Sequence, residues 1–219
     1  MSVISMPKAV FWDWDGTLVD SYGFLSDAHN HTLTQLGFPP FKEGEYKNYF
    51  GKPRDVLYPA IYKDKHLEAI DIFQDYVIGN SHRIKAIPNA RSILDFFHSH
   101  QVTMGIVSNK RSDLIKKEVN HHEWDDFFQV IIGAGDAERD KPSGAPLRMA
   151  IEKSGIDNHA TQNIWYIGDT ENDLACAHDI GCPALFLEGC EGSESLKTQY
   201  SPLFSFSNYL EFTEFLVAI

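Results

Sequence analysis

Short apolar runs alternate with amphipathic segments along most of the chain after residue 86. The runs expected to form strands are Ala9–Trp12, Thr103–Val107, Val130–Ile132, Ile164–Ile167 and Ala184–Leu187. The helical segments between them carry matching end signals, since Asn89 can cap a helix and Gly155 and Gly181 lie where helices should stop. The alternation predicts an α/β fold built on a doubly wound parallel sheet.

Residues 20–85 interrupt this alternation. They contain a helical apolar pattern at Leu67, Ile70, Phe73 and Val77 but no convincing buried strand. We therefore expect an α-helical insertion, 20–85, in a core domain formed by 1–19 and 86–219. Two chain crossings would join the insertion to the core, so it could move as a lid.

The composition and net charge of the chain indicate which kinds of partner it can bind. A chain of 219 residues with 43% hydrophobic content can bury a core, and its net charge of -12 repels polyanions. We expect neither a nucleic acid polymer nor a membrane as a partner. A small phosphorylated ligand would need local positive charge from a metal ion, a few Lys or Arg side chains, or helix N-termini.

The sequence shows no membrane span, signal peptide or disulfide pattern. The chain has no run of about 18 apolar residues, and its opening residues lack the order of a signal peptide, so we expect a cytoplasmic protein. Cys176, Cys182 and Cys190 show no Cys-x-x-Cys spacing and are interpreted as free thiols. The oligomeric state is left open.

Two carboxylates, Asp13 and Asp15, directly follow the first predicted strand, and Gly16 and Thr17 follow them. In open α/β sheets, ligands bind beyond the carboxyl ends of strands. One carboxylate could bind a metal and attack phosphorus while the other transfers protons. A calcium-binding EF-hand is excluded, because Thr17, Leu18 and Phe24 occupy its fifth, sixth and twelfth positions. An ordinary turn after a strand remains the alternative.

Further polar residues follow other predicted strands. Ser108 and Asn109 come after Thr103–Val107, and Asp169 comes after Ile164–Ile167. Ser-Asn is also common turn chemistry, Lys141 before Pro142 could be a solvated lysine, and Thr170 with Asp173 resembles a helix capping box. A capping box does not explain Asp169, whose carboxylate would be costly beside others without a cation.

The sequence Asp13-x-Asp15-Gly16-Thr17-Leu18 resembles the first motif of the haloacid dehalogenase superfamily, and the later polar residues resemble its other three motifs in order. The resemblance implies a Rossmann-like core with a helical C1-type cap and a Mg²⁺-dependent phosphatase that forms a phospho-aspartate. It makes Asp13 the nucleophile and Asp15 the acid/base residue. It assigns phosphate binding to Ser108, Asn109 and Lys141, and Mg²⁺ to Asp13, the Asp15 carbonyl and Asp169, with Asp173 acting through water.

The substrate is less defined. The segment Phe50-Gly51-Lys52-Pro53-Arg54 contains a Gly-x-Pro element similar to that in caps of phosphoglycolate phosphatase-like enzymes, and Lys52 and Arg54 could bind an anionic leaving group. A solvated turn is the alternative. We expect a small phosphorylated metabolite such as phosphoglycolate. A sugar phosphate, a nucleoside monophosphate, a phosphomutase activity and a catalytically silent binding protein remain alternatives.

Some aromatic residues and histidines lack a catalytic assignment. Trp12 is expected to pack in the core, whereas Trp14 is left without a role. The histidine pairs lack the spacing of zinc ligands and are expected to be solvated. These pairs are His29/His31, His98/His100 and His121/His122.

Overall fold

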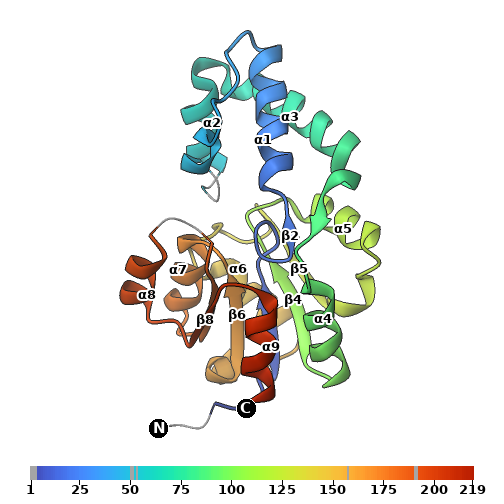
Figure 1. Ribbon diagram of the computed structural model, residues 1–219, viewed down its shortest axis with the longest axis vertical. Coiled ribbons are helices and arrows are strands. Elements are labelled where there is room, and N and C mark those ends of the chain that lie inside the picture. Colours follow the sequence, from blue (N-terminus) through green and yellow to red (C-terminus); the bar gives the residue numbers. More distant parts are fainter. Residues whose placement is uncertain (1–3, 50–51, 53, 157, 190–191) are drawn as a thin grey trace. The chain divides into compact units, whose positions relative to one another are not determined.

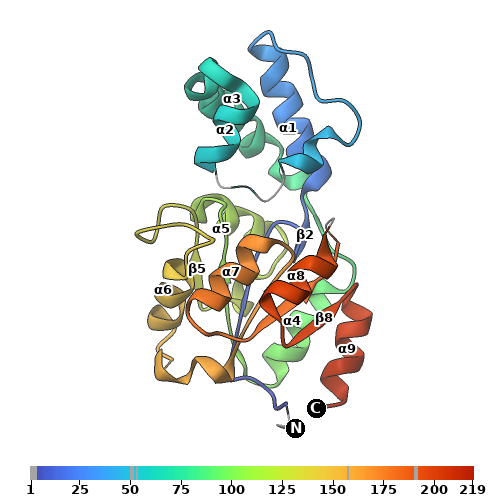
Figure 2. The same cartoon turned by 90° about the vertical axis from the view of Figure 1, so that its left-hand side faces the viewer.

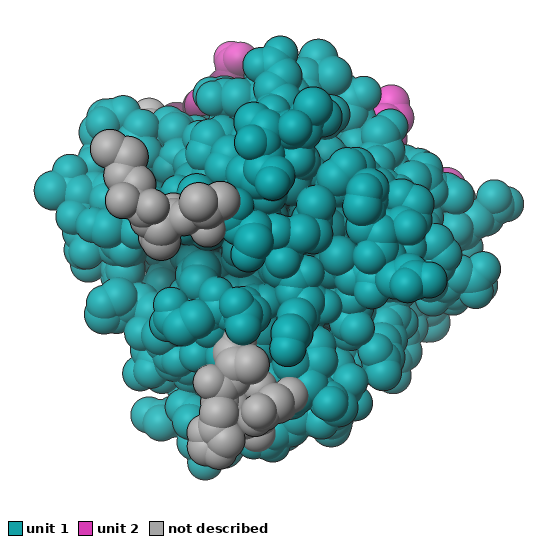
Figure 3. Space-filling model, turned by 90° about the horizontal axis from the view of Figure 1, so that it is seen from below, with its two compact units in different colours: residues 1–19, 86–219 teal, residues 20–85 magenta. Residues whose placement is uncertain are grey.

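The computed structural model of the chain describes residues 4–49, 52, 54–156, 158–189 and 192–219. The chain divides into two compact units, one formed by Met1–Val19 with Ala86–Ile219 and the other by Asp20–Lys85. Figure 3 colours the first unit teal and the second magenta. We refer to them as the core unit and the helical unit.

The core unit contains a six-stranded sheet in which every pairing is parallel. Its order is β5 (Val130–Ile132), β4 (Thr103–Val107), β1 (Ala9–Trp12), β6 (Ile164–Gly168), β7 (Ala184–Leu187) and β8 (Phe204–Phe206). The five predicted strands are confirmed, and β8 is an edge strand that the sequence did not reveal. Because Trp12 is level with Ile106 and Ile167 in the ladders, the residues after β1, β4 and β6 emerge at one edge of the sheet.

Helices cover both faces of this sheet (Figures 1 and 2). They are α4 (Ala90–Ser99), α5 (Ser112–His121), α6 (Ala145–Lys153), α7 (Glu171–Asp179), α8 (Ser193–Tyr200) and α9 (Tyr209–Val217), with 3-10 helices η4 (Asp125–Phe127) and η5 (Asn158–Asn163). Side chains alternate along β1. Phe11 packs in a cluster with α6 and α7, whereas Trp12 contacts the rings of Phe97 in α4 and Tyr209 in α9. The core-packing role expected for Trp12 is confirmed.

The three residues predicted to mark helix ends lie at helix ends. Gly155 and Gly181 follow α6 and α7 with φ values of 73° and 66°, the left-handed conformation that glycine favours after a helix. Asn89 precedes α4, but its φ is 66° and its side chain accepts no capping hydrogen bond from the described backbone. Asn89 is nevertheless the N-cap residue of α4, as predicted, and its carbonyl accepts from the Ile93 N–H at 3.2 Å.

The helical unit consists of α1 (Tyr22–Gln35), α2 (Arg54–Tyr62) and α3 (His66–Asn80), with 3-10 helices η1 (Glu45–Asn48), η2 (Lys63–Lys65) and η3 (Ser81–Arg83). Its core includes Leu33, Ile61 and Ala69. Two short strands, β2 (Val19–Asp20) and β3 (Lys85–Ala86), pair where the chain passes between the units. The fold is therefore a doubly wound parallel sheet with an inserted helical cap.

His29 in α1 corrects the expectation of solvated histidines. Its side chain is buried, and its Nδ1 lies 2.6 Å from the hydroxyl of Tyr62. Rings of Phe73 and Tyr46 lie with their centroids 4.5 and 5.0 Å from the imidazole. Burial lowers the pKa of His29 to about 3, so this histidine is neutral inside the helical unit.

Two further expectations can be compared with the structure. Cys176 and Cys182 are buried free thiols, as predicted, whereas Cys190 lies outside the described residues. Within the described part of the chain, no helix combines the length and apolar character needed to cross a membrane.

Candidate active site

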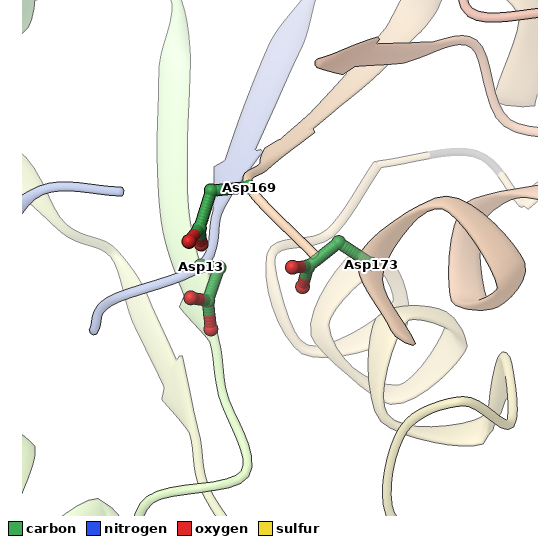
Figure 4. Close-up of side chains that lie close together, drawn as sticks. All are labelled: Asp13, Asp169 and Asp173. Carbon is green, nitrogen blue, oxygen red and sulfur yellow. The ribbon is translucent and has the colours of Figure 1, made fainter. Parts of the chain in front are cut away.

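Three aspartates meet at the carboxyl edge of the sheet. Asp13 follows β1, Asp169 follows β6, and Asp173 lies in the first turn of α7. One carboxylate oxygen from each residue lies within 4.8 Å of the others. Figure 4 shows the three side chains pointing toward one another. The parallel register explains this convergence, because β1 and β6 are neighbours and end at the same level.

The turn after β1 fits closely around this cluster. Gly16 has a φ of 89° and lies against Asp169, so a Cβ at this position would collide with the Asp169 carboxylate. Thr17 Oγ1 donates a 3.0 Å hydrogen bond to Asp169 Oδ1. Tyr209 in α9 also holds this turn in place, because its hydroxyl donates a 2.6 Å hydrogen bond to the Thr17 carbonyl. The residues after Asp13 therefore shape the site as well as reverse the chain.

Lys141 supplies positive charge at the centre of the cluster. Its Nζ lies 2.6 Å from Asp13 Oδ1 and 2.6 Å from Asp173 Oδ1, and it donates to the Tyr166 hydroxyl at 3.1 Å. The side chain is 3% exposed. Burial opposes protonation, but attraction to Asp13 and Asp173 outweighs it and raises the pKa of Lys141. This ammonium is therefore held in its charged form.

Asn109 fixes the backbone of Lys141 with its side-chain amide. Its Nδ2 donates to the Lys141 carbonyl and its Oδ1 accepts from the Lys141 N–H, both at 3.0 Å. Ser108 is buried at the end of β4, and its Oγ accepts from the Lys110 N–H at 3.3 Å. The structure thus places Asn109 beside Lys141, and the predicted contacts of Ser108 and Asn109 with phosphate stay predictions.

Asp15 has a different partner from the three clustered aspartates. Its Oδ1 accepts a 3.0 Å hydrogen bond from the ammonium of Lys110, in the loop after β4. Lys110 also donates to Glu118 Oε2 at 2.7 Å. The sequence motifs placed Asp13 and Asp15 together, and the structure adds a buried cation behind Asp15.

The electrostatics of the cluster favour a further cation. Burial raises the pKa of Asp13 to about 7, although Lys141 opposes this shift and Asp173 adds to it. Burial, then repulsion from Asp13 and Asp173, raises the pKa of Asp169 well above its ordinary value. One ammonium faces three carboxylates. A divalent ion with a preference for oxygen ligands fits this donor set, because it would neutralise the remaining repulsion.

One protein-family model matches most of the chain. A family model described as haloacid dehalogenase-like hydrolase matches residues 10–187, which include all seven core residues predicted for the site. The chain belongs to this family.

Individual proteins similar to this chain include phosphoglycolate phosphatases and a solved structure. A phosphoglycolate phosphatase of Vibrio vulnificus (strain YJ016) is 26% identical over 192 residues, covering 82% of this chain and 83% of that protein. One from Chromobacterium violaceum is 29% identical over 191 residues, covering 81% and 83%. A crystal structure described as a predicted phosphoglycolate phosphatase from Haemophilus somnus has a TM-score of 0.85 at 22% identity, covering 98% and 100%. The structural likeness bears on the fold alone.

The residues predicted to select the substrate lie in the helical unit of this haloacid dehalogenase-like hydrolase. Lys52 Nζ lies 5.6 Å from the ring centroid of Tyr49, and the guanidinium of Arg54 lies 5.1 Å from that of Tyr58. Phe50, Gly51 and Pro53 lie outside the described residues. The roles of Lys52 and Arg54 in substrate binding stay predictions.

Sequence analysis missed Tyr166 and Lys110, which contact predicted site residues, and Glu118, which contacts Lys110. Tyr166 in β6 carries the hydroxyl that meets Lys141 and Asp173, but a tyrosine in an apolar strand is a common core residue. Lys110 directly follows Ser108 and Asn109, and only the fold places it beside Asp15. Glu118 had a usable signal, because it lies on the face of α5 that buries Leu114, Ile115 and Val119, where a carboxylate needs a partner.

Proposed function

We propose that this chain is a Mg²⁺-dependent phosphatase that hydrolyses a small phosphate monoester through a phosphorylated Asp13. The observation that carries the proposal is the cluster of Asp13, Asp169 and Asp173, two of which bond the buried ammonium of Lys141. The relatives named phosphoglycolate phosphatase support phosphoglycolate, or a similarly small anionic monoester, as the substrate.

Two of the proposed metal ligands, Asp13 and Asp169, belong to the aspartate cluster. The carboxylates of Asp13 and Asp169 and the main-chain carbonyl of Asp15 would bind it directly, with Asp173 acting through water. When bound, Mg²⁺ supplies charge neutralisation at the phosphoryl oxygens and the attacking carboxylate. Asp173 is suited to an indirect role, because its Oδ1 binds Lys141 and its Oδ2 accepts from the Thr170 N–H at 3.0 Å and the Thr170 hydroxyl at 2.6 Å.

In the first step, a carboxylate oxygen of Asp13 attacks phosphorus and the ester P–O bond breaks. Asp15 gives its proton to the leaving oxygen, so the alcohol departs neutral. Lys141 holds Asp13 in place and offsets the charge of the phosphoryl group. The Ser108 hydroxyl and the backbone N–H of Asn109 would bind phosphoryl oxygens.

In the second step, water attacks the phosphorus of the aspartyl phosphate. Asp15, now a carboxylate, accepts a proton from this water, and the bond between phosphorus and the Asp13 oxygen breaks. Inorganic phosphate and the original Asp13 carboxylate result, and Asp15 is again protonated. The cycle consumes one water and releases one alcohol and one phosphate.

Hydrolysis of p-nitrophenyl phosphate tests the proposal, measured with Mg²⁺ and after its removal, for the parent protein and for Asp13→Asn. We expect Mg²⁺-dependent turnover in the parent and loss of at least about 1,000-fold in the variant, because the amide is not a nucleophile. Turnover that survives Asp13→Asn would contradict the mechanism. A parent protein without activity on any phosphate ester would favour a binding protein.

A panel of phosphorylated metabolites tests the substrate. We expect the highest kcat/KM for monoesters with small anionic leaving groups, if Arg54 contacts the leaving group. Arg54→Ala should then lower kcat/KM for phosphoglycolate by about 10-fold or more and should affect p-nitrophenyl phosphate less. Lys47→Ala, at an exposed cation of the same unit, is the control. An unchanged kcat/KM for Arg54→Ala would exclude the assignment.

A further inference from the structure

Asp15 is joined to a chain of buried polar groups that the proposed reaction does not use. The ammonium of Lys110 lies 3.0 Å from Asp15 Oδ1, and the two side chains are 8% and 18% exposed. They come from different loops, since Asp15 follows β1 and Lys110 follows β4. The contact therefore depends on the fold rather than on local geometry.

Glu118 is a second partner of the Lys110 ammonium. Its Nζ donates to Glu118 Oε2 at 2.7 Å, and the Glu118 side chain is 1% exposed. Trp14 donates to the same oxygen through its indole N–H at 2.6 Å. The indole is fully buried and packs edge-on against Trp124, with ring centroids 5.9 Å apart. Trp14 and Glu118 thus fix the ammonium at one position.

The ion pairs of Lys110 with Asp15 and Glu118 are not expected to stabilise the fold much. Two carboxylates share one ammonium, and among the described residues nothing bonds to the buried Oε1 of Glu118. Replacing buried ion pairs with apolar residues of similar size is often neutral or stabilising. An unpaired buried carboxylate oxygen adds a further cost. Its retention is better explained by what lies at its exposed end, which is Asp15.

We propose that Lys110 is a positioning residue that orients the Asp15 carboxylate for proton transfer, with Glu118 and Trp14 as its fixed support. The inference rests on the proposed function, because Asp15 has to reach the leaving-group oxygen. A proton donor must lie within hydrogen-bond distance of the atom that it protonates. Lys110 binds one oxygen of Asp15 and so restricts rotation of the carboxylate. Trp14, which has no role assigned from the sequence, then connects to Asp15 through Glu118 and Lys110.

The dependence of rate on the leaving group tests this role. A series of phosphate monoesters, from alkyl phosphates to 2,4-dinitrophenyl phosphate, is assayed with the parent, Asp15→Asn and Lys110→Met. Poor leaving groups need protonation, whereas dinitrophenolate does not. We expect Lys110→Met to lower kcat/KM by about 100-fold for alkyl phosphates and by less than about fivefold for the dinitrophenyl ester. Asp15→Asn should show the same trend with a larger loss.

Controls separate this role from a loss of folding. Lys110→Met leaves Glu118 charged and unpaired, so the double variant with Glu118→Gln removes that charge while keeping an acceptor for Trp14. The double variant should show the same trend. Arg111→Met, at the next cation along the chain, has its ion pair with Asp113 at the surface and should stay within about twofold of the parent for every ester.

The outcomes distinguish the inference from the function beneath it. A uniform loss across leaving groups, or no loss, in both Lys110 variants would overturn the positioning role while hydrolysis by the parent still stands. Absence of the leaving-group trend in Asp15→Asn would remove the proton-transfer role of Asp15 and the inference with it. A parent inactive on the whole series would refute the proposed function itself.

Discussion

Asn109 offers a sharp test of how the site is assembled, because its amide joins the loop after β4 to the segment before α6. Asn109→Ala removes both 3.0 Å hydrogen bonds to the Lys141 backbone. At about 1 kcal/mol for each neutral hydrogen bond, the free energy of unfolding should fall by about 2 kcal/mol. Lys141 would also lose its fixed position, and a displacement of about 1 Å can lower activity about 100-fold.

Asn109→Asp tests the amide group itself. The aspartate can still accept from the Lys141 N–H, but its second oxygen replaces the NH₂ group and faces the Lys141 carbonyl. Two acceptors then oppose each other in a partly buried place, so the loss of stability should be at least as large as for alanine. Asn120→Ala is the matched control. Asn120 is exposed and donates to Asp125 at 3.2 Å, so its loss should cost less than about 0.5 kcal/mol.

Urea denaturation and kinetics measure both effects. The midpoint should fall for Asn109→Ala and Asn109→Asp without a change in m, and kcat/KM for p-nitrophenyl phosphate should fall with it. Asn109→Asp as stable as the parent would refute the two-bond clamp. Parent-like kcat/KM in Asn109→Ala would show that Lys141 does not depend on it.

Three further predictions follow from the aspartate cluster, the turn after β1 and the helical unit. Adding Mg²⁺ at about ten times its Kd should raise the free energy of unfolding by about 1.4 kcal/mol in thermal denaturation, and Asp169→Asn should abolish this gain. Gly16→Ala should lose activity by more than about 100-fold because its Cβ would displace Asp169, whereas Gly37→Ala, at a φ of 78° with nothing within 4 Å, should lose only about 1 kcal/mol of stability and no activity. The pKa of His29 is about 3 when folded and 6.5 ordinarily, so the unfolded chain binds an extra proton between these values and stability should fall as pH drops from about 6.5, by at most about 1.4 kcal/mol per pH unit. His29→Gln should flatten that slope in urea midpoints between about pH 6 and 4.5, and an unchanged slope would show that His29 is not the group that titrates.

The sequence alone predicted the strands well, because a single property, hydrophobicity, determines where they lie. The five predicted strands are short, mostly buried apolar runs, and hydrophobicity alone locates them. Asp13, Lys141, Asp169 and Asp173 were identified by their resemblance to the family's motifs, and the parallel sheet brings the ends of β1 and β6 to one edge. Edge strand β8, Phe204–Phe206, was not predicted because Ser205 interrupts its apolar run and only Phe206 is buried, whereas the equally short β5 is apolar throughout.

Residues whose role depends on distant partners could not be predicted. His29 shares the buried face of α1 with Phe24 and Leu33, but its burial depends on aromatic rings and a tyrosine hydroxyl from other helices. Lys110, which precedes α5, pairs with Glu118 on the buried face of that helix, and the fold brings Asp15 to the same ammonium. Sequence spacing identifies a candidate charged residue, whereas the fold decides which opposite charge meets it.

Capture of the phosphorylated enzyme tests the central claim most directly. The protein is mixed with substrate and Mg²⁺, quenched within a turnover and treated with borohydride, which reduces an aspartyl phosphate to homoserine, and its peptides are then sequenced by mass spectrometry. We expect homoserine at Asp13, and no such conversion in Asp13→Asn. Homoserine at another aspartate, or a quenched enzyme without any conversion during active turnover, would contradict the account.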